Sequence, residues 1–189
     1  GSIEDGTLRI DRLTADVPDG AEALILDLYR RMPSVRITDM LLEVDAALGF
    51  TDAFTHLRTG APCRDRIGLL NVLLAEGLNL GLRKMAEATN THDYWQLSRL
   101  ARWHVESEAM NQALAIVVAA QGKLPMSRVW GMGTSASSDG QFFPTARHGE
   151  AMNMVNAKYG SVPGLKAYTH VSDQFAPFAC QSIPATVSE

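Results

Sequence analysis

Two long amphipathic tracts constrain the fold of this chain more than any other feature of its sequence. Over Asp65–Ala88 and Asp93–Gln121 the apolar residues recur every three or four positions, which is the period of one helix face. A helix places such residues on one side, where they can pack into a core. We therefore predict two long helices here, joined by a loop at residues 90–92.

Shorter segments before these tracts carry the same period. Ala21–Arg31 is rich in strong helix formers and is followed by a proline, which stops a helix. Thr38 predicts the N-cap of a second helix, which Gly49 would end. The residues before these helices are polar, so the sequence predicts an irregular arm over 1–20 and a helical region over 21–125.

The last third of the chain changes to the pattern of strands. Asn153–Tyr159 and Leu165–Val171 have the composition of strands, and Ser161–Gly164 between them predicts the turn of a hairpin. Phe178–Val187 predicts a third strand. Helices followed by strands indicate an α+β fold, whose strand-rich part we expect over 126–189.

A segment rich in glycine, serine and threonine, Trp130–Gln141 (WGMGTSASSDGQ), leads into this part and contains one acid, Asp139. We expect a strand running into a loop. Such a loop can bring backbone N–H groups close to a ligand, often a phosphate. It does not match the glycine-rich pattern that ends in Gly-Lys-Ser/Thr. From the residues alone, a ligand site and a plain solvated loop both remain open.

The net charge of −4 over 189 residues argues against a self-sufficient DNA-binding domain. The charge is uneven, however. Residues 1–60 hold eleven acids and six bases, whereas residues 61–189 hold ten acids and eleven bases. The later part is close to neutral, so it could face a polyanion through a few well-placed basic side chains.

Basic side chains on the helical tracts are candidate DNA contacts if they line one surface. Exposed charges on helices are usually only solvated, so this alternative stays open. Trp95 and Trp103 lie near these bases in the sequence and would permit stacking on bases or sugars. The candidates for DNA binding are Arg83, Lys84, Arg99, Arg102 and Lys158.

Several classes of protein are disfavoured by what the sequence lacks. Cys63 and Cys180 make no disulfide framework, which suits a reducing compartment. No apolar run reaches about 18 residues and no signal peptide is recognisable, so we predict a cytoplasmic chain without membrane association. The histidines have no partner three or four positions away, so there is no zinc signature.

Six separated blocks between Val35 and Phe178 resemble, in order, the Tn3 family of replicative bacterial transposases. Six blocks in the right sequence are far more specific than any one motif. They are Gly49–Gly60 (GFTDAFTHLRTG), Asn79–Glu87 (NLGLRKMAE), Trp103–Glu106 (WHVE), Trp130–Gln141, Val155–Gly160 (VNAKYG) and Tyr168–Phe178 (YTHVSDQFAPF).

The resemblance implies a ribonuclease-H-like catalytic region, of which this chain would carry a helical part and the first strands. In that family an Asp-Asp-Glu triad holds two divalent metals, normally Mg²⁺, and the partner is transposon-end DNA. Carboxylates suit this role because Mg²⁺ prefers hard oxygen ligands.

Asp139 is the better match to the first acid of the triad, as catalytic and metal-binding residue. Met132 occupies the alternative position, and a thioether there could not replace a hard oxygen donor. The resemblance puts the second Asp and the Glu downstream of the segment that matches Phe178. At most one triad acid is then present, so we predict that the isolated chain does not cut DNA.

Two functions remain open at this stage. The first is a fragment of a replicative transposase, inactive by itself. The alternative is a non-catalytic helical interaction or dimerisation domain. The predicted strand at Phe178–Val187 contains Pro184, which confines it to an edge or a bulge, and an exposed edge favours a homodimer.

Overall fold

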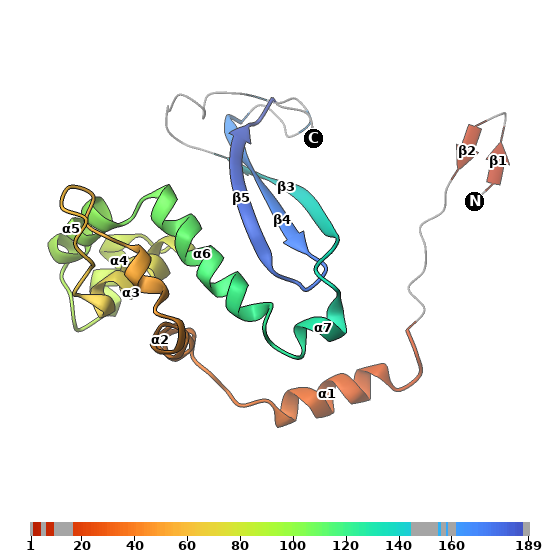
Figure 1. Ribbon diagram of the computed structural model, residues 1–189. Coiled ribbons are helices and arrows are strands. Elements are labelled where there is room, and N and C mark those ends of the chain that lie inside the picture. Colours follow the sequence, from red (N-terminus) through yellow and green to blue (C-terminus); the bar gives the residue numbers. More distant parts are fainter. Residues whose placement is uncertain are drawn as a thin grey trace. The chain divides into compact units, whose positions relative to one another are not determined.

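The computed structural model describes residues 17–144, 155, 158 and 162–186, together with the backbone of the strands β1 (Ser2–Glu4) and β2 (Thr7–Arg9). The chain divides into two compact units, residues 1–39 and residues 40–189. The described part combines helices with two antiparallel sheets (Figure 1). The predicted α+β class is therefore confirmed.

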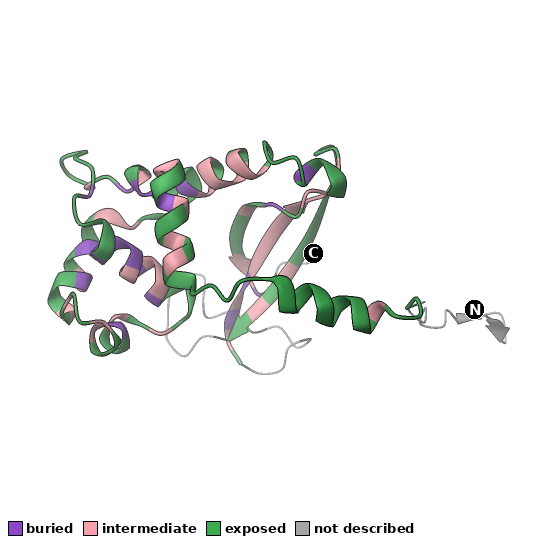
Figure 2. Cartoon of the chain, turned by 90° about the horizontal axis from the view of Figure 1, so that it is seen from below, coloured by how far each residue is buried: buried purple, intermediate pink, exposed green. Residues whose placement is uncertain are grey.

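The first unit holds a short hairpin and one helix. β1 and β2 pair in antiparallel fashion within the segment predicted to be irregular. The dipeptide Asp-Gly between them is a favoured hairpin turn, a signal that the sequence interpretation overlooked. Helix α1 (Ala21–Arg31) has the predicted bounds and buries none of its residues, as its exposed colour in Figure 2 shows.

Helix α2 (Ile37–Leu48) begins one residue before the N-cap predicted at Thr38, which therefore lies inside the helix. It ends where predicted, because Gly49 adopts a left-handed conformation with φ of 65°. The 3₁₀ helix η1 (Phe50–Ala53) follows at once. Its Phe50 is buried in the helical core.

The first long tract forms two helices instead of the predicted one, α3 (Arg66–Gly77) and α4 (Leu82–Ala88). The break contains two residues with positive φ, Asn79 at 51° and Gly81 at 77°. An α-helix cannot continue through this conformation, which Gly adopts freely and Asn tolerates. The prediction of a single helix was wrong because the strong apolar period concealed the break.

The second long tract is also divided, into α5 (Tyr94–His104) and α6 (Ser107–Gln121). Val105 and Glu106 are extended and interrupt the helix. Helix α5 starts at a capping box, in which Asp93 and Gln96 satisfy each other's backbone N–H groups. The period alone predicted the helical faces correctly but did not reveal the interruption.

The core of the second unit lies among these helices. The side chains of Phe54, Leu69 and Leu97 come from the loop after η1, from α3 and from α5, and they are almost fully buried. Figure 2 shows the buried residues concentrated on this group of helices. Within the described residues, no helix is long and apolar enough to cross a bilayer.

A buried ion pair ties α2, η1 and α3 together. The Asp45 side chain is 6% exposed and accepts hydrogen bonds from the backbone N–H of Thr51 at 2.9 Å and from Nη1 of Arg66 at 3.0 Å. Arg66 also reaches Asp52 at 2.6 Å. Each buried charge therefore has a partner of opposite charge or a backbone donor, as burial requires.

The segment after α6 differs from the prediction. The strand expected to begin the Trp130–Gln141 segment is absent, and Trp130 is instead the last residue of the short helix α7 (Ser127–Trp130). The expected loop instead contains strand β3 (Ala136–Pro144). Serine and glycine favour loops by composition, but β4 (Gly164–Ser172) gives this segment a continuous backbone partner, and such pairing overrides propensity.

The main sheet has the order β3-β4-β5, with β5 at Pro177–Pro184 and both pairings antiparallel. The predicted strand at Leu165–Val171 is confirmed as β4, and the predicted third strand corresponds to β5, which ends at Pro184. Both edges of β4 are taken by β3 and β5, so the predicted hairpin with Asn153–Tyr159 is wrong. Most of that segment lies outside the described residues.

Replacing the buried carboxylate should weaken the fold. We expect Asp45→Ala to lower the free energy of unfolding by about 2 kcal/mol, since the Thr51 N–H loses its acceptor and Arg66 loses its buried partner. Urea denaturation of both proteins measures this difference.

Asp27→Ala is the matched control, because Asp27 pairs with Arg31 on the exposed surface of α1. Exposed pairs of this kind contribute about 0.2–1 kcal/mol. If both substitutions lower the free energy of unfolding equally, the Asp45 interaction contributes no more than an exposed ion pair.

Candidate functional site

Strand β3 carries Asp139 near its middle, opposite Thr169 of β4. Thr169 is in turn opposite Cys180 of β5, and its hydroxyl donates to the Cys180 sulfur at 3.5 Å. Directly opposed residues point to the same face of a sheet. Asp139, Thr169 and Cys180 therefore form one row across this face.

The same face is turned toward the helices where β5 lies beside α6. Cys180 and Ser182 line a hollow of about 780 Å³ together with Val72 of α3 and Leu114 of α6. Asp139 lies on β3, which is at the opposite edge of the sheet from β5. Its position leaves its side chain exposed to solvent.

The Asp139 carboxylate has the chemistry of one metal ligand. Its Oδ1 accepts the N–H of Gly140 at 2.8 Å, and no other hydrogen bond or ion pair occupies the carboxylate among the described residues. An exposed carboxylate with free lone pairs is a suitable oxygen donor for a divalent cation. The described residues contain no group of three His, Cys, Asp or Glu side chains that could hold a metal.

The opposite face of the sheet holds a second row. Ser138 alternates with Asp139 along β3, and its hydroxyl lies 2.6 Å from Nδ1 of His170 in a hydrogen bond. The His170 ring contacts the rings of Tyr168 and Phe178 at centroid distances of 5.2 and 6.0 Å. Because Ser138 lies on the face of His170, its neighbour Asp139 points to the other face of the sheet.

Asp173 holds the segment that leads into β3. Its carboxylate accepts the N–H of Gly133 at 2.9 Å, the N–H of Thr134 at 3.4 Å and the hydroxyl of Ser135 at 3.1 Å. A Cβ atom on Gly131 would collide with Asp173, so glycine is required there by close approach. The start of β3 is therefore pinned to the end of β4.

These hydrogen bonds also determine the pKa of Asp173. Desolvation, the largest single cause, raises the pKa, but the donors Ser135, Gly133 and Thr134 together outweigh it and lower the pKa. The ionised form thus supports the folded segment. Its contribution to the stability of the fold is present above the pKa of an ordinary aspartate and is lost as the pH falls through the lowered pKa of Asp173.

Residues 39–189 match the family model described as the Tn3 transposase DDE domain. The chain belongs to this family. It is 47% identical over 176 residues to the transposase for transposon Tn21 of Escherichia coli, and 46% identical over 176 residues to that for Tn3926 of the same organism. Both alignments cover 93% of this chain and 18% of the relative.

The transposase for transposon Tn501 of Pseudomonas aeruginosa is 43% identical over 187 residues, which covers 99% of this chain and 19% of the relative. The chain therefore spans about a fifth of the length of these Tn3-family transposases. The resemblance expected from the six sequence blocks is confirmed. The chain is a segment of a Tn3-family transposase. A DDE transposase domain generally implies a divalent metal cofactor and DNA binding.

The five basic residues predicted to bind DNA are all exposed. The guanidinium of Arg83 on α4 lies over the Tyr94 ring at 4.9 Å, and Lys84 is its neighbour in the helix. Arg99 and Arg102 are on α5. Lys158 lies in a segment of which little is described, so the five-residue DNA site stays a prediction.

Arg99 lines a hollow of about 600 Å³ beside Arg58 and Arg64, which the sequence interpretation did not single out. The sequence did contain a signal for these two arginines, because Arg58 lies inside the GFTDAFTHLRTG block and Arg64 follows that block closely. The three residues are separated by up to 41 positions, so only the fold reveals that they are neighbours.

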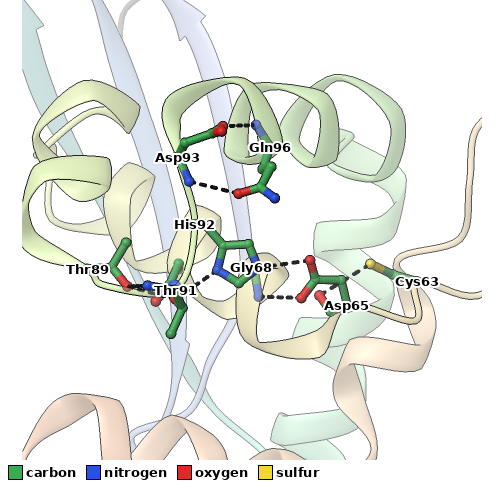
Figure 3. Close-up of polar contacts among 9 residues, drawn as sticks. Cys63, Asp65, Gly68, Thr89, Thr91, His92, Asp93 and Gln96 are labelled. Atoms are coloured by element: carbon green, nitrogen blue, oxygen red, sulfur yellow. Dashed lines mark hydrogen bonds and ion pairs between the residues drawn. The ribbon is translucent and has the colours of Figure 1, made fainter.

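Asp65, which lines this hollow, is the centre of a network of hydrogen bonds (Figure 3). Asp65 caps α3 by accepting the Gly68 N–H at 2.9 Å, and its other oxygen lies 2.9 Å from Nε2 of His92. Thr91 contacts the second nitrogen of His92 at 2.8 Å. Burial raises the pKa of the neighbouring Cys63 thiol, which counts against Cys63 as a nucleophile.

Removing the Asp173 carboxylate should loosen residues 133–135, which lead into β3. We expect Asp173→Ala to accelerate hydrogen exchange at the amides of Gly133 and Thr134, since both lose their acceptor. The wild-type protection should fall in acid, when Asp173 is protonated. Hydrogen exchange followed by NMR across this pH range measures both effects.

Asp173→Asn is the control, because an amide oxygen keeps one acceptor and loses the charge. It should retain part of the protection at neutral pH. Unchanged exchange in Asp173→Ala would show that the carboxylate does not hold the segment.

Proposed function

We propose that this chain is the part of a replicative transposase that supplies the first metal-binding carboxylate, Asp139, for DNA cleavage and strand transfer at transposon ends. The observation that carries the proposal is an exposed carboxylate on the central part of β3, in a chain whose family is defined by a DDE domain. The three-stranded order β3-β4-β5 supports the view that these are the first strands of a ribonuclease-H-like sheet.

Asp139 is favoured over the position of Met132 on chemical grounds. Met132 is 78% exposed in the segment between α7 and β3, and its only heteroatom is a soft thioether sulfur. Mg²⁺ selects hard oxygen ligands and would not be held by this group. Asp139 offers such oxygens on a strand fixed by hydrogen bonds along its whole length.

The chain's own residues would orient the carboxylate and leave it open to solvent and substrate. Gly140 donates to Oδ1, which supports the ionised form and leaves Oδ2 for a cation. When bound, Mg²⁺ would activate a water or a 3′-hydroxyl and stabilise the leaving oxygen. The remaining ligands would come from other parts of the transposase, because one carboxylate binds Mg²⁺ weakly.

Removal of this carboxylate tests the proposal. In a transposase that contains this segment, Asp139→Asn should lower Mg²⁺-dependent cleavage of transposon-end DNA by roughly a thousandfold or more. Binding of the same DNA should be unchanged. Strand cleavage followed on denaturing gels, with binding measured in parallel, gives both quantities.

Met132→Ala is the matched control and should cleave normally. The 189-residue chain alone should not nick the DNA with Mg²⁺ or Mn²⁺. Normal cleavage by Asp139→Asn, or robust nicking by the chain alone, would refute the assignment of Asp139 as one ligand of a larger site.

A second function, self-association, is favoured by one observation. β5 is an edge of the described sheet, and an unpaired edge can accept a strand from another copy. Pro177 and Pro184 lie at its two ends, so the part able to pair is short. This function would not exclude the first.

If the edge of β5 pairs between copies, the chain should form a homodimer that does not depend on DNA or strongly on salt. Light scattering at increasing protein concentration measures the mass. A monomer at all concentrations would exclude the homodimer.

A further inference from the structure

Three arginines surround the hollow beside α5. Arg58 comes from the loop after η1, Arg64 from the segment before α3, and Arg99 from α5. All three side chains are exposed at its rim. Like charges that converge on one hollow repel each other, and a bound anion would relieve this repulsion.

These arginines differ from other arginines of the chain in their partners. Arg66 reaches two carboxylates, and Arg36 pairs with Asp39 at 2.8 Å. In the described part of the chain, the guanidinium groups of Arg58, Arg64 and Arg99 make no ion pair or hydrogen bond. Their hydrogen-bond donors are therefore available to a ligand.

The acid that lines the same hollow is already engaged. Both oxygens of Asp65 are used, one by the Gly68 N–H and one by His92 (Figure 3). Asp65 keeps its negative charge, but three arginines against one aspartate leave the lining of the hollow with a formal excess of two positive charges. The local potential of the hollow is positive although the whole chain carries −4.

The fold holds the arginine-bearing loop in place. The N–H of Leu57 donates to the carbonyl of Trp103 at 2.8 Å, and Nδ1 of His104 lies 3.1 Å from the carbonyl of Phe54. The ring of His56 stacks on Trp103 at 5.0 Å. Gly60 closes the turn with φ of 67°. A preorganised loop loses little conformational entropy when it binds an anion.

We propose that this hollow binds a backbone phosphate of DNA through Arg58, Arg64 and Arg99. Guanidinium groups donate two parallel hydrogen bonds to phosphate oxygens, which suits a phosphodiester. DNA is the favoured source because the proposed function, on which this inference rests, brings a DNA strand to the same chain. The contact positions the strand and does not read its sequence.

The test is DNA binding by the 189-residue chain over a range of salt concentrations. Fluorescence anisotropy with a labelled transposon-end duplex gives the dissociation constant at each concentration. Each of Arg58→Ala, Arg64→Ala and Arg99→Ala should weaken binding and reduce the slope of log Kd against log salt by about 1. Arg99→Lys should keep the slope, because its charge is retained.

Arg128→Ala is the matched control, because it removes one exposed positive charge from α7, outside the hollow. Circular dichroism and urea denaturation check that each variant is folded. An equal loss of binding in Arg128→Ala, or no binding of the duplex by the wild-type chain, would overturn the inference. Saturable binding of inorganic phosphate without binding of the duplex would also overturn it, by assigning the hollow to a free anion.

The DNA-binding test of the three arginines is independent of the cleavage test of Asp139. Asp139→Asn should bind the duplex with wild-type affinity and salt slope, because it lies outside the hollow. If cleavage persists in Asp139→Asn, the proposed catalytic role fails. The salt slopes of the arginine variants still decide whether the hollow contacts DNA.

Discussion

The buried carboxylate of Asp45 is the constraint on which the helical part of the second unit depends. It cannot remain charged and buried without partners, so α2 must end beside η1 and α3 must begin where Arg66 can reach it. Arg66 is the first residue of α3, directly after its cap Asp65. One junction thus fixes the helices and also the wall of the arginine-lined hollow.

Asp173 performs the corresponding task for the sheet. By accepting three donors from residues 133–135, it determines where β3 begins. The register between β3 and β4 then follows, and with it the face on which Asp139 lies. A shift of one residue would turn Asp139 to the face of His170. A second carboxylate, that of Asp173, therefore helps to position the candidate metal ligand.

The sequence predicted the elements whose signal is local. The period of apolar residues identified α1, α2 and the faces of the long tracts, whereas Asp139, which the six blocks suggested, stays a prediction. The breaks at Asn79 and Val105 were missed because backbone conformation there opposes a strong apolar period. β3 was missed because its composition favours a loop and only pairing with β4 makes it a strand. The hollow could not be predicted, since its arginines lie far apart in sequence.

The distribution of partners also explains why net charge is a poor guide to what this chain binds. Asp45, Asp52, Asp65 and Asp173 are counted in the −4, yet each accepts hydrogen bonds or ion pairs from within the chain. Arg58, Arg64 and Arg99 have no such partners among the described residues and face solvent around one hollow. Arg66 offsets part of the charge of Asp45 and Asp52 at short range, and Asp65 is the one acid among the residues that line the hollow with the three arginines. An acidic chain can therefore present a basic surface where a polyanion would approach.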